Sequence, residues 1–94
     1  MKVYITKYAL TQGIFEREAI SREKNSMLVV EPGALNDQYR YYASEWHETF
    51  DEAVTHAKYM RYKKVLTLIN QITKLEKMEF ETPTSLSRQA GNLG

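Results

Sequence analysis

This chain's fold is decided at Thr49-Phe50-Asp51-Glu52, a stretch that matches the capping box found at helix N-termini. In a capping box the threonine hydroxyl accepts a hydrogen bond from the amide three residues on, and the glutamate side chain reaches back to the threonine amide. Asp51 and Glu52 also put negative charge at the positive end of the helix dipole. The stretch therefore predicts that a helix begins at Phe50.

The predicted helix continues to about Met78, because no glycine or proline interrupts residues 50–78 and most of them are good helix formers. At 1.5 Å per residue, such a helix is about 40 Å long. A β-unit as small as the one that precedes it cannot cover a rod of this length.

The segment before the helix predicts a small antiparallel sheet. Val3–Leu10 is rich in β-branched and aromatic residues and is expected to be a strand. Ile14–Ile20 resumes the β pattern after the polar stop Thr11-Gln12-Gly13, so the two segments are expected to form a hairpin. After a polar loop over Ser21–Ser26, the continuous apolar run Met27–Val30 is expected to be the buried centre of the sheet.

A proline-glycine turn divides the rest of the β region. Pro32-Gly33 fits the central positions of a type II turn, because proline presets φ and glycine accepts a positive φ. Beyond the loop Ala34–Asp37 come Gln38–Tyr42 and Glu45–His47, which are expected to form one strand or two short strands. The predicted fold class is thus α+β: an antiparallel sheet of about three to five strands, which could curl into a half-open barrel, followed by one long C-terminal helix.

Size and composition are those of one small domain. With 94 residues the chain has room for one core, which we expect in residues 1–80, with a β-unit over 2–47 and a flexible tail over 81–94. The net charge of +1 argues against a protein that grips nucleic acid by bulk charge. Because the chain has 0 cysteines, disulfides, zinc–thiolate sites and thiol nucleophiles are excluded.

Neither a secretory signal nor a membrane span is indicated by the sequence. Residues Met1–Lys7 alternate polar with apolar side chains and lack a charged region followed by an apolar stretch. The longest apolar clusters, Met27–Val30 and Val65–Ile69, are far shorter than the roughly 20 residues that cross a bilayer. The cytoplasm is the expected location.

Two apolar stripes divide the predicted helix. The first is suited to packing on the sheet and comprises Phe50, Ala53, Val54, Ala57 and Met60. The second follows a heptad-like spacing and comprises Val65, Leu68, Ile69, Ile72 and Leu75. Four cations mark the change from one stripe to the other: Lys58, Arg61, Lys63 and Lys64. We expect the helix to run off the edge of the sheet at this point.

The second stripe needs a cover. Leaving an aliphatic side chain exposed forgoes about 1.5–3 kcal/mol relative to burial, which a small domain can hardly tolerate five times over. Cover could come from a folded-back tail, from the chain's own β-unit or from the same stripe on a second copy. A self-complementary apolar patch makes the simplest closed interface, so we expect a homodimer. The alternative is a helix that lies wholly across its own sheet.

A mixed aromatic and basic surface is also predicted. Tyrosine and arginine are preferred anchors of protein interfaces, and aromatic rings beside cations can also stack on nucleic-acid bases. We expect a protein partner first, nucleic acid second and an enzyme a distant third. The alternative is that half of these rings face the core and the rest cover its rim, which is ordinary in small sheets. The candidate residues are Tyr39, Arg40, Tyr41, Lys58, Arg61, Tyr62, Lys63 and Lys64.

Catalytic and metal sites are not indicated. Glu52 and His56 lie four residues apart on one predicted helix face, but no third metal ligand is apparent. His47 could act as a general base only beside a nucleophile and an orienting carboxylate, and the sequence does not reveal such a convergence. No phosphate loop, nucleophile elbow or dinucleotide fingerprint occurs. We expect no cofactor, no metal and no enzymatic activity.

Three sets of residues carry a resemblance to other proteins: Lys2-Val3-Tyr4-Ile5-Thr6-Lys7-Tyr8-Ala9-Leu10-Thr11-Gln12-Gly13-Ile14, then Trp46-His47-Glu48-Thr49, and then Glu52-Ala53, Met60-Arg61 and Lys63-Lys64. Across about residues 2–80 the chain resembles small uncharacterised proteins encoded by phages, prophages and other mobile elements. The resemblance implies no catalytic residue. It implies a setting in which small proteins often bind a host or phage macromolecule, sometimes to blunt a defence system.

Overall fold

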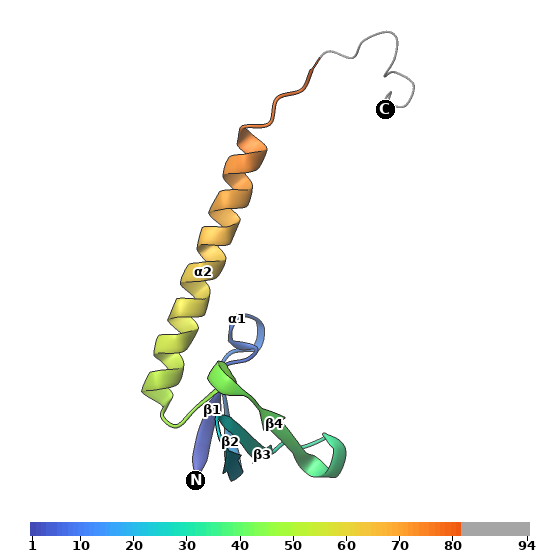
Figure 1. Ribbon diagram of the computed structural model, residues 1–94, viewed down its shortest axis with the longest axis vertical. Helices are drawn as coiled ribbons and strands as arrows, with labels where there is room; N and C mark the ends of the chain where they lie inside the picture. The colour runs from blue at the N-terminus through green and yellow to red at the C-terminus, as the bar shows by residue number, and fades with distance from the viewer. Residues whose placement is uncertain (82–94) are drawn as a thin grey trace.

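A computed structural model describes residues 1–81 of the chain; the predicted tail over 81–94 lies, apart from Glu81, outside the described residues. The fold is a five-stranded antiparallel sheet followed by one long helix, α2, which confirms the α+β prediction (Figure 1). In chain order the elements are β1 (Lys2–Ile5), α1 (Ala9–Gln12), β2 (Phe15–Glu23), β3 (Ser26–Val30), β4 (Gln38–Tyr41), β5 (Trp46–His47) and α2 (Phe50–Glu76), with 3-10 turns at Leu35–Asp37 and Ala43–Glu45.

The strand order is β4-β3-β2-β1-β5, so the last strand returns to pair with the first. The centre of the sheet is therefore β2 and not Met27–Val30, as the apolar run had suggested. Within that run Val29 is fully buried whereas Val30 is 39% exposed, because successive residues of a strand face opposite sides of the sheet. The run belongs to β3, next to the centre, and only one of its faces meets the core.

The sheet curls so that both of its edges share one core. Tyr41 on the edge strand β4 and Trp46 on the opposite edge strand β5 belong to the same buried cluster. The Trp46 indole Nε1 also donates a hydrogen bond to the Asn25 carbonyl at 2.8 Å, which ties β5 to the turn between β2 and β3. A register shift between Ala19 and Ser21 interrupts the pairing of β2 with β3, and such irregularities bend a strand. The remaining members of the buried cluster are Val3, Ile5, Met27 and Val29.

The first predicted strand is shorter than expected. Of the segment Val3–Leu10, only the part up to Ile5 is strand, and Ala9–Gln12 forms the helical turn α1. The Thr6 amide still donates to the Glu45 carbonyl at 2.9 Å and its hydroxyl donates to the Ser44 carbonyl at 3.1 Å, but the chain then turns, and the Ala9 amide donates to the Thr6 carbonyl at 3.0 Å. β1 and β2 do pair antiparallel, with Val3 opposite Arg17, but residues 6–14 connect them in place of the predicted tight hairpin.

Most of the loop predicted over Ser21–Ser26 is strand. β2 continues to Glu23 and β3 begins at Ser26, so that only Lys24 and Asn25 form the turn. Lys24 adopts a positive φ of 56°, and the Ser26 hydroxyl donates to the Glu23 carbonyl at 2.9 Å across the turn. The Pro32-Gly33 turn agrees with its prediction, since Gly33 has a φ of 91° and the Ala34 amide donates to the Glu31 carbonyl at 3.1 Å.

The long helix begins at Phe50, as predicted, and ends at Glu76, two residues before the predicted Met78. The Thr49 hydroxyl accepts the Glu52 amide at 3.1 Å and so caps the first turn. The first stripe packs on β1, β5 and α1 through the fully buried Ala53, flanked by the half-buried Val54, Ala57 and Met60. Phe50 departs from the prediction: it is 53% exposed, and its ring lies edge-on to Tyr4 at the rim.

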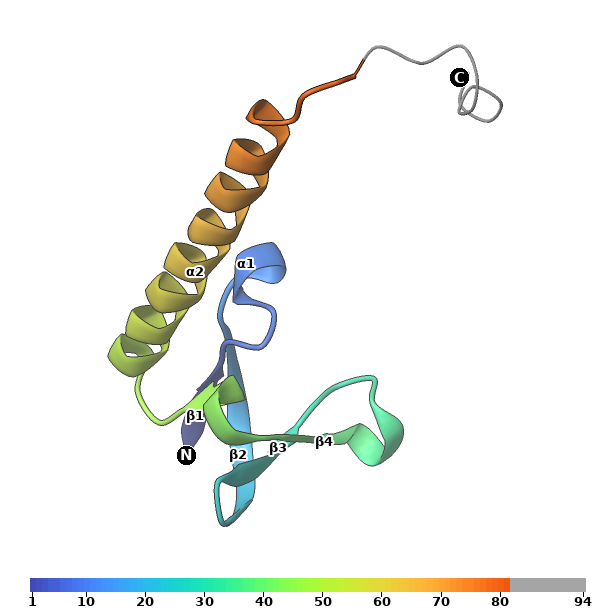
Figure 2. The same ribbon diagram turned by 45° about the horizontal axis from the view of Figure 1, so that its top comes forward.

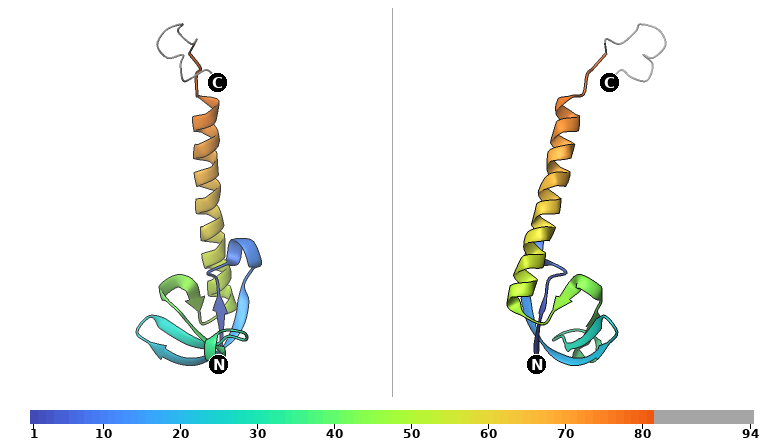
Figure 3. Two further views of the ribbon diagram at one scale, coloured as in Figure 1. Left: turned by 90° about the vertical axis from the view of Figure 1, so that its right-hand side faces the viewer. Right: turned by 60° about the vertical axis from the view of Figure 1, so that its left-hand side comes forward.

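Beyond Met60, α2 leaves the β-unit and projects alone (Figures 2 and 3). All residues over 61–81 are exposed except the half-buried Thr73. The prediction that the helix runs off the sheet near Lys58 to Lys64 is confirmed, and the alternative of a helix lying wholly across its own sheet is wrong. Over residues 1–81, no helix has both the length and the apolar character needed to cross a membrane.

Candidate interaction surfaces

The first surface is the second apolar stripe, hereafter the α2 stripe: Val65, Leu68, Ile69, Ile72 and Leu75. Its five side chains are 43–67% exposed, although aliphatic groups of this size are usually buried. Leu66, which the sequence prediction left out, adjoins the stripe and is 42% exposed. This part of the helix carries a continuous apolar surface in contact with solvent.

The α2 stripe is centred to one side of the face of α2 that packs on the β-unit. At about 100° per residue, the α2 stripe lies about 90° around the helix axis from the side that packs on the sheet through Ala53, Ala57 and Met60. The side of the projecting half that continues above the sheet is polar, with Lys64, Thr67 and Gln71. Most of the α2 stripe thus lies beside the line along which α2 meets the sheet, and Leu75, five turns beyond Ala57, lies nearest to that line.

The second surface is a basic girdle, defined as Lys58, Arg61, Lys63 and Lys64. The four cations are exposed; at about 100° per residue Lys58, Arg61 and Lys64 lie within about 120° of one another on one side of the helix, and Lys63 lies on the other side. Lys63 Nζ lies 5.4 Å from the centroid of the Tyr59 ring, and Tyr62 is 60% exposed beside it. Within residues 1–81, none of the four cations lies within ion-pair distance of an acidic group.

The strand residues predicted for a partner surface divide into three roles. Tyr39 is 40% exposed and remains a surface residue. Arg40 is half-buried, and its Nη1 donates to the Ser26 hydroxyl at 2.8 Å. Tyr41 is only 3% exposed, so it is a core residue that can offer a partner only a small part of its ring. Tyr39 and Tyr41 share one face of β4 because they are two residues apart, and the curl of the sheet covers the second ring but not the first.

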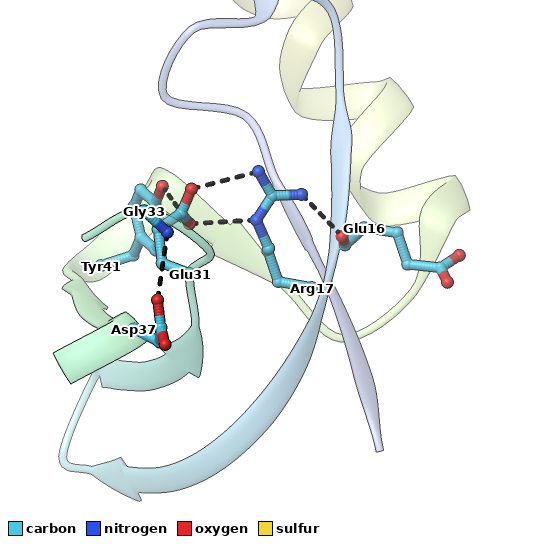
Figure 4. Close-up of polar contacts among 6 residues, drawn as sticks. All are labelled: Glu16, Arg17, Glu31, Gly33, Asp37 and Tyr41. Atoms are coloured by element: carbon cyan, nitrogen blue, oxygen red, sulfur yellow. Dashed lines mark hydrogen bonds and ion pairs between the residues drawn. The ribbon is translucent and has the colours of Figure 1, made fainter. Parts of the chain in front are cut away.

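Tyr41 forms a polar network with Arg17 and Glu31 (Figure 4). Its hydroxyl donates to Glu31 Oε1 at 3.1 Å, and Arg17 donates to the same carboxylate from Nε at 3.0 Å and from Nη2 at 3.1 Å. Burial and the neighbouring carboxylate raise the pKa of Tyr41. The hydrogen bonds from Arg17 hold the pKa of Glu31 below its usual range. These groups satisfy one another, which is typical of a structural network.

The residues of this network also form part of the wall of an aromatic groove. It has a volume of about 310 Å³ and was not found from sequence, because its walls come from three separate segments. Lys7 stands at the rim, where its Nζ is 3.4 Å from the Tyr39 hydroxyl and 3.7 Å from a Glu45 carboxylate oxygen. The lining residues are Tyr8, Gln12, Phe15, Arg17, Glu31, Tyr39 and Tyr41. Tyr39 and Tyr41 are the two lining residues that the sequence had indicated as partner-surface candidates.

The partner residues predicted from sequence thus do not form one surface. Tyr39 and Arg40 lie on β4, at one edge of the sheet, whereas the basic girdle lies on α2, which packs at the other edge against β1 and β5 (Figures 1 and 2). The girdle adjoins the α2 stripe, and Tyr39 adjoins the aromatic groove.

The two histidines meet where the sheet joins the helix. The rings of His47 on β5 and His56 on α2 have centroids 5.0 Å apart, and His47 Nε2 lies 3.0 Å from the Thr6 hydroxyl. Burial, followed by the nearby His56, lowers the pKa of His47, while Glu52 opposes the shift. Among residues 1–81 no three His, Cys, Asp or Glu side chains are grouped so that they could hold a metal ion.

Comparison with protein-family models, with curated proteins and with solved structures finds no match to this chain.

Proposed function

We propose that this chain is a non-enzymatic binding protein that self-associates through the α2 stripe and presents its β-unit to a protein partner. One observation carries the proposal: a helix half with five exposed aliphatic side chains that its own β-unit does not cover. Because burying such side chains is favourable and the patch is self-complementary, a second copy is the simplest cover. Two heptads give a small interface, so we expect micromolar affinity.

Self-association is tested by sedimentation or light scattering between 1 and 100 µM, a range of about two decades around the expected dissociation constant. Leu68→Asp together with Ile72→Asp puts charge into the α2 stripe and should leave a monomer with an intact β-unit. The matched control is Thr67→Asp with Asn70→Asp, which adds the same charge on the opposite side of the helix and should leave the dimer. A wild-type chain that stays monomeric at 100 µM would refute the proposal.

The protein partner is the second part of the proposal. The exposed Tyr39, the Lys7 beside it and the aromatic groove supply the kind of aromatic and cationic anchors that protein interfaces prefer. With the resemblance to mobile-element proteins, they support an accessory or modulator protein of such an element, acting inside the host cell. An enzyme receives no comparable support from the described residues.

Affinity purification from the native host tests this part when it is run with paired variants. Tyr39→Ala should abolish capture of a specific partner, whereas Tyr42→Ala removes a neighbouring exposed ring from outside the groove and should leave capture unchanged. Equal capture by both variants would rule out the groove as the partner site.

Nucleic acid is the second candidate, and the basic girdle favours it. Exposed tyrosines between cations suit stacking on bases together with phosphate contacts. Three of the four cations share one side of the helix, as in many nucleic-acid binders, but the net charge of only +1 argues against binding through bulk charge. A salt-dependent affinity for oligonucleotides would favour this candidate, and each of Arg61→Ala and Lys64→Ala should then reduce the slope of log affinity against log salt by about 1. Absence of binding at low salt would eliminate it.

A further inference from the structure

The α2 stripe has the composition of a two-stranded helix pair. Val65 and Ile72 occupy the a positions of a heptad, while Leu68 and Leu75 occupy the d positions. β-branched residues at a with leucine at d favour two strands over three or four. What this pattern leaves open is the relative direction of the two helices, and the residues at the ends of the α2 stripe bear on it.

Oppositely charged residues stand at the two ends of the α2 stripe. In the same heptad spacing, Arg61 lies four residues before Val65 and Glu79 lies four residues after Leu75. Glu79 lies three residues beyond Glu76, the last residue of α2, and the chain between them keeps two bonds to the last turn: the Lys77 amide donates to the Thr73 carbonyl at 3.0 Å and the Met78 amide to the Leu75 carbonyl at 3.3 Å. Both charged side chains are exposed and could meet a second copy.

A parallel and an antiparallel pair of helices bring different charges together. In a parallel pair each residue faces its own counterpart, so Arg61 would face Arg61 and Glu79 would face Glu79. In an antiparallel pair centred on Asn70, Val65 meets Leu75 of the second copy, Leu68 meets Ile72, and Arg61 meets Glu79 at both ends. The first arrangement puts like charges together and the second puts opposite charges together.

The positions of the basic girdle and of the β-unit also favour the antiparallel arrangement. A parallel pair would bring both girdles together, with the Lys58 and Arg61 side chains of the two copies on the facing side of the helices. An antiparallel pair separates the girdles and sends the two β-units to opposite ends, where neither obstructs the other. Resting on the self-association proposed above, we propose that the second copy binds antiparallel, with Arg61 of each copy opposite Glu79 of the other.

The absence of cysteine makes the direction measurable, because one introduced cysteine is the only labelling site. A spin label on Thr55→Cys, an exposed position near the start of α2, should give an inter-label distance of about 45 Å for the antiparallel pair at 1.5 Å per residue. A parallel pair, with helix axes about 10 Å apart, should give a distance under about 25 Å. A short distance in a dimeric sample would overturn the antiparallel inference while leaving self-association intact.

Charge exchange provides an independent test. For the antiparallel pair, Arg61→Glu alone and Glu79→Arg alone should each weaken dimerisation about tenfold, and the double variant should restore it. A parallel pair predicts no such pattern, because each single change replaces one like-charge contact by another. Circular dichroism confirms that the variants keep their helix. A monomeric wild type would refute self-association and this inference together. A dimer whose affinity is unchanged by the single charge substitutions would refute only the inference.

Discussion

The guanidinium of Arg17 donates two hydrogen bonds to the carboxylate of Glu31, at 3.0 and 3.1 Å, and so joins the central strand β2 to the segment that follows β3 (Figure 4). The side chains of the pair are only 26% and 20% exposed. A paired arginine and carboxylate with little access to water interact more strongly than an ion pair on the surface.

Glu31→Gln should therefore lower the free energy of unfolding by about 1–3 kcal/mol, because it removes the charge that Arg17 and the Tyr41 hydroxyl both contact. Urea denaturation at pH 7 measures the effect. The control is Glu16→Gln, the same chemical change at a carboxylate that lies 3.5 Å from Lys2 on the surface, and its effect should be below about 0.5 kcal/mol. Equal effects of the two substitutions would contradict a special role for the Arg17–Glu31 pair.

Thr49→Ala should lower the free energy of unfolding by about 1 kcal/mol, because the Glu52 amide loses the hydroxyl that caps the first turn of α2. Thr49→Ser keeps a hydroxyl at the same position and should retain most of the stability. Thermal or urea unfolding of the three proteins decides the matter. If serine and alanine were equally destabilising, the cap would not be the cause.

Acidification from pH 7.5 to 5.5 should destabilise the fold through His47. The folded protein lowers the pKa of His47 through burial and the nearby His56, so below about pH 6.5 the unfolded chain binds a proton more readily than the folded one. Stability is thus present above the unfolded pKa and is lost as pH falls toward the folded pKa.

Urea unfolding at the two pH values measures this dependence, and His47→Gln should flatten it. The groups around the imidazole are the Thr6 hydroxyl, His56 and Glu52. Greater stability of the wild type at pH 5.5 than at pH 7.5 would reverse the sign and disprove the explanation.

The projecting half of α2 should gain helicity with protein concentration. Residues 61–76 are exposed apart from Thr73, and an isolated helix of this length is marginally stable in water. Dilution below the dissociation constant should therefore reduce the helical circular dichroism and speed hydrogen exchange beyond Met60, while the sheet stays protected. Helicity that does not change on dilution, in a sample shown to dissociate, would mean that this half of the helix needs no partner.

Local signals were sufficient for the helix and for the Pro32-Gly33 turn. The cap at Thr49, the absence of breakers and the change of stripe at the basic girdle all act between residues a few positions apart. The start of α2 and its departure from the sheet were accordingly predicted correctly. The uncovered α2 stripe also followed from sequence, because a 27-residue helix outreaches a sheet with strands of two to nine residues.

Contacts between distant segments decided what the sequence did not reveal. β2 continues through Ser21–Glu23 although these residues have no apolar alternation, because its pairing with β3 satisfies their backbone. Thr6, directly after β1, is held by Ser44 and Glu45, two residues that lie far from it in the sequence. Burial of Tyr41 but not Tyr39, and the meeting of His47 with His56, depend on the curl of the sheet and on the path of α2 across it.

The sequence by itself thus determined the fold class, the bounds of the long helix to within two residues and the surface that needs a cover, since each depends on the order of side chains along a single element. Only the tertiary structure decided which strand is central, which tyrosine is a surface residue and where the aromatic groove lies. Those features depend on which segments meet after the sheet curls, and that outcome is set by the sum of many weak contacts between residues far apart in the chain.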